Sequence, residues 1–252
     1  MHTLLATFST RQIRGIPYAE PLTQHDLPRR RDRTSTEPTG TPLLTWQAMS
    51  EPFGGMPTRW DPGLGPSSRV AIVLPGSGYS PAHPLLEFGR QALLQHGWTV
   101  QQVWWDHLRD LPDDETMDWV CQQTTAVLEA EAEAERILVV AKSLGTLASP
   151  VVAERVLDAI WMTPLFSMPK SIEAITANAA TGARQLLVGG LADPEWQSES
   201  AHDLAAQEAG IEVAEFADAS HFMHVPDDTL RSVEIQSGVS RALDAFLSAI
   251  TG

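Results

Sequence analysis

One serine in the sequence stands where a catalytic nucleophile would be expected. Ser143 follows an apolar run in "RILVVAKSLGT" and has small residues two positions away on each side, Ala141 and Gly145. A strand, a cramped turn and a helix in succession present such a serine on strained backbone, and the small neighbours avoid a clash. A serine hydroxyl attacks acyl groups when a histidine, oriented by a carboxylate, takes its proton. The pattern therefore indicates acyl chemistry, provided that the chain supplies a histidine and an acid nearby.

The same turn contains "KS", which also occurs in phosphate-binding loops. Such a loop needs the spacing G-x-x-x-x-G-K-[ST], because glycine-freed amides wrap the phosphates. The residues before Lys142 are "ILVVA", without a glycine, and "GSGYS" at residues 76–80 supplies only G-x-G. We therefore reject a nucleotide site and expect Lys142 to face away from the reaction.

The elements that must position these residues follow an alternating pattern. Apolar runs that predict strands alternate with helical patterns, and this predicts an α/β fold with a mostly parallel sheet covered by helices on both faces. The expected strands lie at residues 70–74, 98–105, 136–141, 157–165, 183–190 and 211–217. The expected helices lie at residues 83–97, 113–134, 143–156, 193–210 and 238–250, and Pro150 should kink or break the third of them.

The N-terminal part of the chain has a different composition. Residues 1–42 are rich in Pro, Arg and Thr and predict a poorly ordered extension, so we expect the folded domain to span residues 43–252. A strand or hairpin is expected from Leu43, and repeated prolines predict an irregular segment from there to Arg69.

The carboxyl ends of parallel strands meet at one edge of a sheet, where reactive residues are expected. Asp193 follows the strand expected at residues 183–190, and both His221 and His224 follow the last one. Asp158 precedes a strand and so belongs to the opposite edge, whereas Asp106 follows a strand and is a rival to Asp193. The spacing predicts Ser143 as nucleophile and Asp193 as acid, with His221 or His224 as base.

The chain from about Val70 onward resembles the α/β-hydrolase superfamily, in particular small members without a cap that are similar to dienelactone hydrolases. The motifs are "LPGSGYS", "AKSLGT", "LVGGLADPEW" and "ADASHFM", although Ala141 stands where the family usually has glycine. The resemblance implies that His221 is the base, and it makes Asp106 a weaker rival to Asp193, because Asp106 follows a strand that the family does not use for the acid. It also implies an oxyanion hole formed by the backbone N–H groups of Leu144 and Ser77, with Gly78 close behind.

Few residues separate the strands at 157–165 and 183–190, so we expect no cap domain and an open site for small or medium acyl groups. Gly78 and Trp161 are the expected pocket residues. We expect neither a cofactor nor a metal, because the pair His221 and His224 has no third ligand in view.

The composition excludes several classes of partner. The net charge is −15, which disfavours nucleic acid and anionic membranes, and no apolar run is long enough to span a bilayer. The first 20 residues lack the apolar core of a secretory signal, and the single cysteine, Cys121, excludes an internal disulfide. We expect a cytoplasmic protein, a monomer or small homo-oligomer, whose partner is a small-molecule acyl substrate.

The sequence thus predicts a serine esterase acting through an acyl-enzyme. Two alternatives remain at this point. One is a protein on the same fold that binds a ligand or partner without turnover, since fold does not imply activity. The other is an acyltransferase that uses the same three residues.

Overall fold

A computed structural model describes residues 57–105 and 112–251 of the chain. The extension expected over residues 1–42, the strand or hairpin expected from Leu43, and Asp106 lie outside the described residues. The domain boundary therefore stays a prediction.

The described residues form one seven-stranded sheet in the order β1-β3-β2-β4-β5-β6-β7. The strands from β2 to β7 pair in parallel, whereas β1 pairs antiparallel with β3 at one edge. The bounds are β1 (Arg59–Trp60), β2 (Arg69–Leu74), β3 (Thr99–Gln102), β4 (Arg136–Lys142), β5 (Asp158–Met162), β6 (Gln185–Gly190) and β7 (Ile211–Phe216). The expected α/β architecture with a mostly parallel sheet is confirmed.

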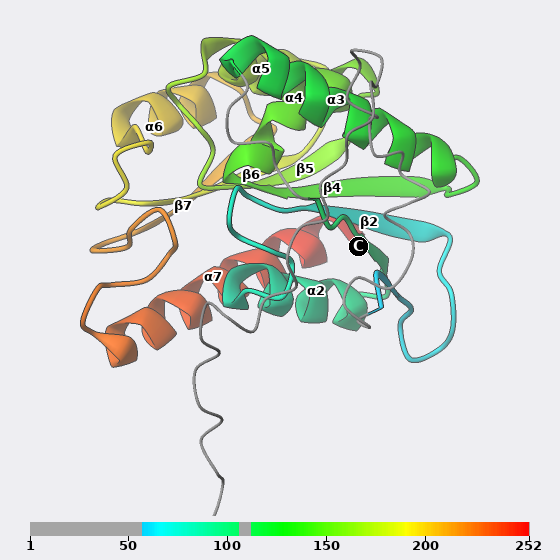
Figure 1. Ribbon diagram of the computed structural model, residues 1–252, viewed down its shortest axis with the longest axis horizontal. Helices are drawn as coiled ribbons and strands as arrows, with labels where there is room; N and C mark the ends of the chain where they lie inside the picture. Colours follow the sequence, from blue (N-terminus) through cyan, green and yellow to red (C-terminus); the bar gives the residue numbers. More distant parts are fainter. Residues whose placement is uncertain (1–56, 106–111, 252) are drawn as a thin grey trace, which may run out of the picture. The chain divides into compact units, whose positions relative to one another are not determined.

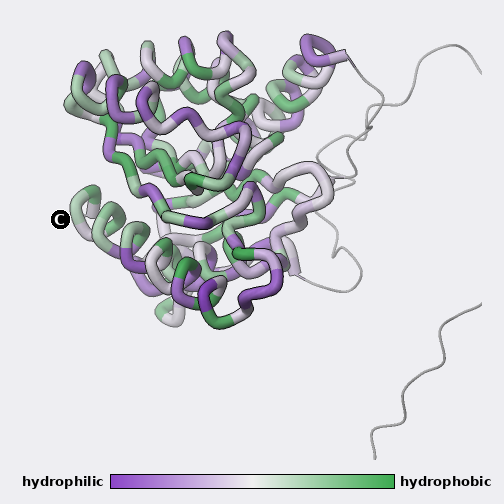
Figure 2. The backbone as a smooth tube through the Cα atoms, turned by 90° about the vertical axis from the view of Figure 1, so that its left-hand side faces the viewer, coloured by the Kyte–Doolittle hydropathy of each residue, from purple (hydrophilic) through white to green (hydrophobic). Residues whose placement is uncertain are grey.

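The strands in the middle of the sheet are buried on both faces, which is why they are continuous apolar runs in the sequence. Along β2, Val70, Ile72 and Leu74 pack into one hydrophobic cluster, and Ala71 and Val73 pack into another. This alternation follows from the two-residue period of a strand. Figure 2 shows the hydrophobic stretches of the chain gathered at the strands between the helical layers.

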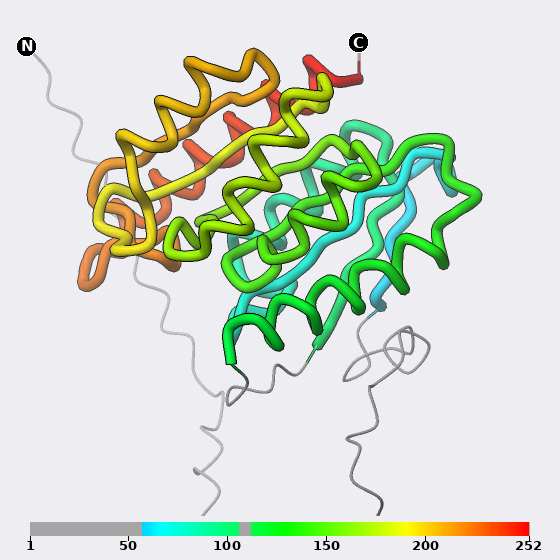
Figure 3. The backbone as a smooth tube through the Cα atoms, turned by 90° about the horizontal axis from the view of Figure 1, so that it is seen from above, coloured from blue at the N-terminus to red at the C-terminus, as the bar shows by residue number. Residues whose placement is uncertain are grey.

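Helices cover both faces of the sheet (Figure 1). One face carries α2 (Pro84–Gln95) and α7 (Thr229–Thr251). The other carries α3 (Asp113–Ala130), α4 (Ser149–Glu154), α5 (Pro169–Ala180) and α6 (Ser198–Gln207). Figure 3 looks down on this second layer and shows its helices side by side over the strands.

The structure corrects four local expectations. The helix expected over residues 143–156 is divided near Pro150, as predicted, because Pro150 has no N–H and sits in the first turn of α4. Its first part, however, is a 3₁₀ helix, η1 (Ser143–Ala148). Helix α5 was not expected, and α7 begins at Thr229, well before residue 238. The segment from Pro57 to Arg69 is irregular except at β1, where two residues between prolines keep their N–H groups and pair with the sheet edge.

The strands β4, β6 and β7 end at Lys142, Gly190 and Phe216. Because these strands are parallel, the segments that follow them leave the sheet at the same edge. Ser143, Asp193 and His221 lie on those three segments. No helix among residues 57–105 and 112–251 is long and apolar enough to cross a membrane.

Candidate active site

Ser143 lies on a sharp turn between β4 and η1. Lys142 is still extended, with φ −118° and ψ 128°, whereas Ser143 has a φ of 50°. This left-handed conformation is strained for a residue other than glycine, and such strain concentrates at functional sites. The hydroxyl of Thr146 donates a 2.6 Å hydrogen bond to the carbonyl oxygen of Ser143, which fixes the turn from inside.

Two small residues let this turn fit against the sheet. A Cβ atom on Gly145 would lie 2.7 Å from the carbonyl oxygen of Leu74 and 2.9 Å from that of Pro75. Only glycine therefore fits where η1 begins beside β2. Ala141 belongs to β4, is fully buried and pairs with Leu74, so this position needs a small side chain but no unusual backbone. The alanine that departs from the family pattern is accommodated for that reason.

The side chains of Ser143, His221 and Asp193 form a continuous chain of hydrogen bonds. His221 Nε2 lies 2.7 Å from Ser143 Oγ, and His221 Nδ1 lies 2.8 Å from Asp193 Oδ2. An ionised carboxylate can only accept, so Nδ1 carries the proton and Nε2 is left to accept from the serine hydroxyl. The Asp193 side chain is fully buried, and its other oxygen accepts the backbone N–H of Glu195 at 2.9 Å.

Two glycines at the end of β6 allow the acid and histidine loops to come together. A Cβ atom on Gly190 would lie 2.2 Å from the carbonyl oxygen of Ala219, and one on Gly189 would lie 2.1 Å from the ring of Trp196. The backbone N–H of Ala192 also donates to the carbonyl oxygen of Ala219 at 3.0 Å. The motif "LVGG" therefore packs both loops directly on the sheet edge.

The structure shows which of the two candidate histidines, His221 or His224, reaches Ser143. Met223 is fully buried under the turn that starts at Ser220, and the backbone N–H of Met223 closes this turn on the Ser220 carbonyl oxygen. His221 points to Ser143, whereas His224 Nδ1 lies 3.4 Å from the hydroxyl of Ser220. The rival acid Asp158 is the first residue of β5 and accepts a hydrogen bond from Arg136. It therefore lies at the edge of the sheet opposite to Ser143.

The residues expected to form an oxyanion hole lie beside Ser143. Gly76 and Tyr79 exchange backbone hydrogen bonds of 3.1 and 3.4 Å, which makes exposed Ser77 and Gly78 the tip of a tight turn. A Cβ atom on Gly76 would lie 3.3 Å from Ser143 Cβ, so this turn adjoins the serine. Leu144 follows Ser143 in the first turn of η1, where N–H groups have no acceptor within the helix.

Trp161 lies elsewhere. It is fully buried in the core on β5, and its indole N–H donates a 2.7 Å hydrogen bond to the side chain of Gln185. Contrary to expectation, it has no exposed surface and belongs to the hydrophobic cluster between the sheet and the helices α3 to α6 rather than to a pocket wall.

Sequence reasoning missed the surroundings of Lys142. Its side chain is 1% exposed, and Nζ lies 4.7 Å from the ring centroid of Tyr79 and 5.2 Å from that of Phe222. Burial lowers the pKa of this amine to about 8, although the charge of Asp193 acts in the opposite direction. The only sequence signal was a lysine at the end of a strand that is otherwise apolar and buried.

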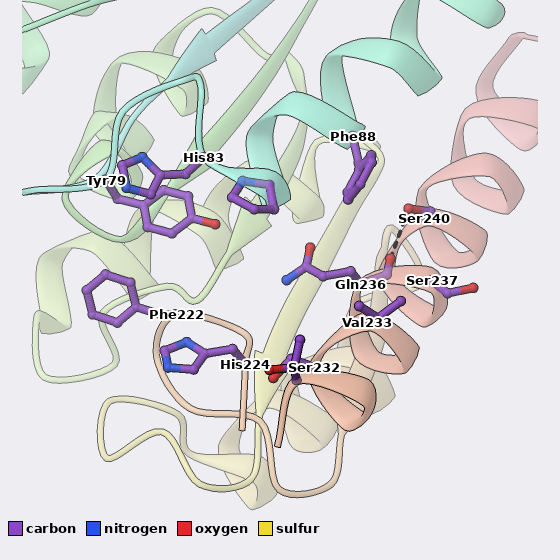
Figure 4. Close-up of a pocket in the computed structure, with 12 residues that line it drawn as sticks. Tyr79, His83, Phe88, Phe222, His224, Ser232, Val233, Gln236, Ser237 and Ser240 are labelled. Carbon is purple, nitrogen blue, oxygen red and sulfur yellow. Dashed lines mark hydrogen bonds between the residues drawn. The ribbon is translucent and has the colours of Figure 1, made fainter. Parts of the chain in front are cut away.

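An apolar groove of about 670 Å³ opens between α2 and α7 next to the histidine loop (Figure 4). Figure 4 shows Tyr79 and His83 stacked at one end, with Phe222 and His224 below them and Phe88 on the α2 side. Tyr79 and Phe222 therefore belong both to the wall of this groove and to the surroundings of Lys142.

No group of acidic, histidine or cysteine side chains able to hold a metal ion occurs among residues 57–105 and 112–251.

Comparison with known proteins gives the fold. No family model and no curated protein matches the sequence. An α/β serine hydrolase homologue from Coxiella burnetii matches with a TM-score of 0.56 at 18% identity, over 73% of this chain and 89% of that chain. Est1E from Butyrivibrio proteoclasticus matches with a TM-score of 0.60 at 13% identity, over 76% and 92% of the two chains.

A third structure is XC6422 from Xanthomonas campestris, described as an α/β serine hydrolase without a lid. It matches with a TM-score of 0.56 at 18% identity, over 76% of this chain and 87% of that chain. At these identities the likeness establishes architecture, and the protein has the α/β-hydrolase fold. In the described residues, α5 is the helix between β5 and β6, so the expectation of no large cap domain is confirmed.

Proposed function

We propose that the protein is a serine hydrolase that cleaves an ester or a related acyl bond through an acyl-enzyme on Ser143. The observation that carries the proposal is the pair of hydrogen bonds, 2.7 and 2.8 Å long, that joins Ser143, His221 and Asp193 on the segments after three separate strands. A strained serine, a histidine of defined tautomer and a buried carboxylate are the parts that nucleophilic acyl chemistry needs.

In the proposed reaction, Ser143 Oγ attacks the acyl carbon while His221 Nε2 takes the hydroxyl proton. The backbone N–H groups of Leu144 and Ser77 stabilise the negative charge that develops on the carbonyl oxygen. The imidazolium then gives its proton to the leaving alcohol, and the ester becomes an acyl-enzyme. Water, deprotonated by His221, attacks the acyl-enzyme, and the proton returns to Ser143 as the acid product leaves.

Asp193 acts through the histidine. Its buried carboxylate accepts the Nδ1–H of His221, which keeps Nε2 free as a base and stabilises the imidazolium that forms. Since Asp193 also accepts a backbone N–H, the carboxylate has a fixed orientation before substrate binds.

We propose small to medium acyl groups as substrates, because one helix and short loops separate β5 from β6 and no cap domain encloses the site. Ferulic acid occurs bound to Est1E in one related structure, so a ferulate ester belongs in the substrate series. The series should include p-nitrophenyl acetate, butyrate, octanoate and palmitate. Faster turnover of the palmitate than of the butyrate would refute this preference.

The direct test of the function is ester hydrolysis by the wild-type protein and by Ser143→Ala. We expect kcat to fall by about 10⁶-fold in the variant, the loss typical of a removed serine nucleophile. Ser68→Ala is the matched control, because Ser68 precedes β2 and lies at the opposite edge of the sheet. Equal activity of wild type and Ser143→Ala would reject Ser143, and preferential transfer to an added alcohol would indicate an acyltransferase.

A further inference from the structure

Lys142 is an unusual side chain to find inside a strand. It is 1% exposed, and burying an ammonium is costly unless partners compensate. Within the part of the chain that the structure describes, its amine makes no hydrogen bond, and it lies over two aromatic rings. Distances of 4.7 and 5.2 Å to the ring centroids lie within the range of cation–π attraction, which is stronger when the cation is desolvated.

The two rings belong to different loops of the candidate site. Tyr79 closes the turn that carries Ser77, and it is held firmly because its hydroxyl accepts the N–H of Leu85 at 3.1 Å. Its ring also stacks on His83, with centroids 4.5 Å apart. Phe222 directly follows His221 and is 45% exposed, so fewer contacts hold it.

We propose that Lys142 is a positioning residue of the candidate active site: its buried ammonium holds Tyr79 and Phe222, and through them the loops that carry Ser77 and His221. The inference rests on the proposed function. Lys142 is the last residue of β4 and directly precedes Ser143, so both loops are held relative to the turn that carries the proposed nucleophile. The lysine stem also fills the space beside Gly76, where an added Cβ would lie 3.0 Å from Lys142 Cδ.

The contact of the Lys142 ammonium with the rings of Tyr79 and Phe222, called the clamp below, depends on the charge of Lys142. The ionisable groups that face it are Asp193 on the loop after β6, the Tyr79 phenol, and the imidazoles of His83, His221 and His224 behind or beside the two rings. The Tyr79 phenol stays neutral, because burial raises its pKa to about 12.

The sign of the pH dependence follows from these groups. Burial lowers the pKa of Lys142 from 10.5 to about 8. The ammonium is therefore present below pH 8 and is lost above it, and activity falls as the clamp loosens.

The test compares Lys142→Met, which keeps the stem without the charge, with Lys142→Arg, which keeps a charge at all accessible pH values. The control is Lys170→Met, because Lys170 is the other lysine of the sequence and is exposed on α5. With an uncharged ester, we expect Lys142→Met to lose up to about 10²-fold in kcat at pH 7 with little change in KM.

The pH profiles add a readout that packing alone would not move. Wild-type activity should fall above pH 8 toward the level of Lys142→Met, whose own profile stays flat there. Lys142→Arg should keep its activity to pH 10. A folded Lys142→Met with the kcat and the pH profile of wild type would overturn the proposal.

Hydrogen–deuterium exchange at pH 7 tests the clamp independently of turnover. Peptides that cover residues 76–80 and 219–224 should take up deuterium faster in Lys142→Met than in wild type or Lys170→Met. Unchanged uptake would overturn the clamp even if the protein hydrolyses esters. If wild type hydrolyses no ester but the uptake rises, the proposed function fails and the clamp stands.

Discussion

Replacing Gly190 by alanine should misplace His221 without touching any of the three hydrogen-bonded side chains. The added Cβ would lie 2.2 Å from the carbonyl oxygen of Ala219. A comfortable carbon–oxygen contact is at least about 3.3 Å, so the loop at Ala219 must retreat by roughly 1 Å. Ala219 lies two residues before His221, whose Nε2 is 2.7 Å from Ser143 Oγ. A retreat of that size takes the distance beyond about 3.5 Å, where a hydrogen bond is no longer made.

A displacement of about 1 Å can cost 10²-fold in rate, which corresponds to about 2.7 kcal/mol of transition-state stabilisation. We therefore expect Gly190→Ala to lower kcat/KM for a short-chain ester about 10²-fold. Crowding should also lower the free energy of unfolding by about 1–3 kcal/mol, so activity must be measured well below the melting temperature.

The matched control is Gly63→Ala, because a Cβ on Gly63 meets no atom within 4 Å. This variant should keep the activity and stability of wild type. If folded Gly190→Ala keeps kcat/KM within about twofold of wild type, a barrier change of about 0.4 kcal/mol, then the close packing of β6 on the histidine loop does not position His221.

Three further predictions concern ionisable side chains. Asp193→Asn should lower kcat by about 10⁴-fold, because the amide favours the wrong tautomer of His221. A thermal unfolding curve shows whether the fold persists. Unchanged kcat would contradict the role of the carboxylate. For Lys142, the lowered pKa means that the cost of the buried charge is present below pH 8 and disappears as pH rises to 10.5. Between pH 8 and 10.5, the free energy of unfolding of wild type, measured with urea, should therefore rise by up to roughly 3 kcal/mol more than that of Lys142→Met. Parallel plots of this free energy against pH for the two proteins would contradict the prediction. Burial, together with the charge of Asp118, raises the pKa of Cys121 to about 11. A disulfide reagent should therefore react with Cys121 at pH 7.5 only after unfolding, and ester hydrolysis should stay intact. Rapid loss of activity would contradict this.

The central strands were predictable because burial on both faces leaves an unambiguous pattern. Residues such as Val70 to Leu74 and Leu138 to Ala141 have no polar member, and each run stops at a turn. The alternation with helices then fixed the parallel sheet, and the parallel sheet indicated the edge where Ser143, Asp193 and His221 lie.

Helix α5 was missed because its buried face is partly polar. Ser171 and Asn178 face inward beside Ile175, so the apolar period of a helix is weak. Both polar side chains reach backbone carbonyl oxygens, Ser171 that of Thr146 and Asn178 that of Leu157. Such pairings join residues far apart in the sequence, and hydrophobic periodicity carries no trace of them.

The environment of Lys142 was unpredictable for the same reason. Tyr79 and Phe222 lie far from it along the chain, and only the folded sheet edge brings their rings to the amine. Trp161 failed as a pocket residue because its position near a strand end was not enough to show which face it occupies or that Gln185 satisfies its N–H.

Covalent labelling with a fluorophosphonate probe tests the central claim most directly. We expect one probe molecule to attach to each chain, and we expect peptide mass spectrometry to place it on Ser143. Labelling should disappear in Ser143→Ala but not in Ser68→Ala. Attachment to a different residue, or no attachment to a folded wild-type protein, would contradict the assignment of Ser143 as an activated nucleophile.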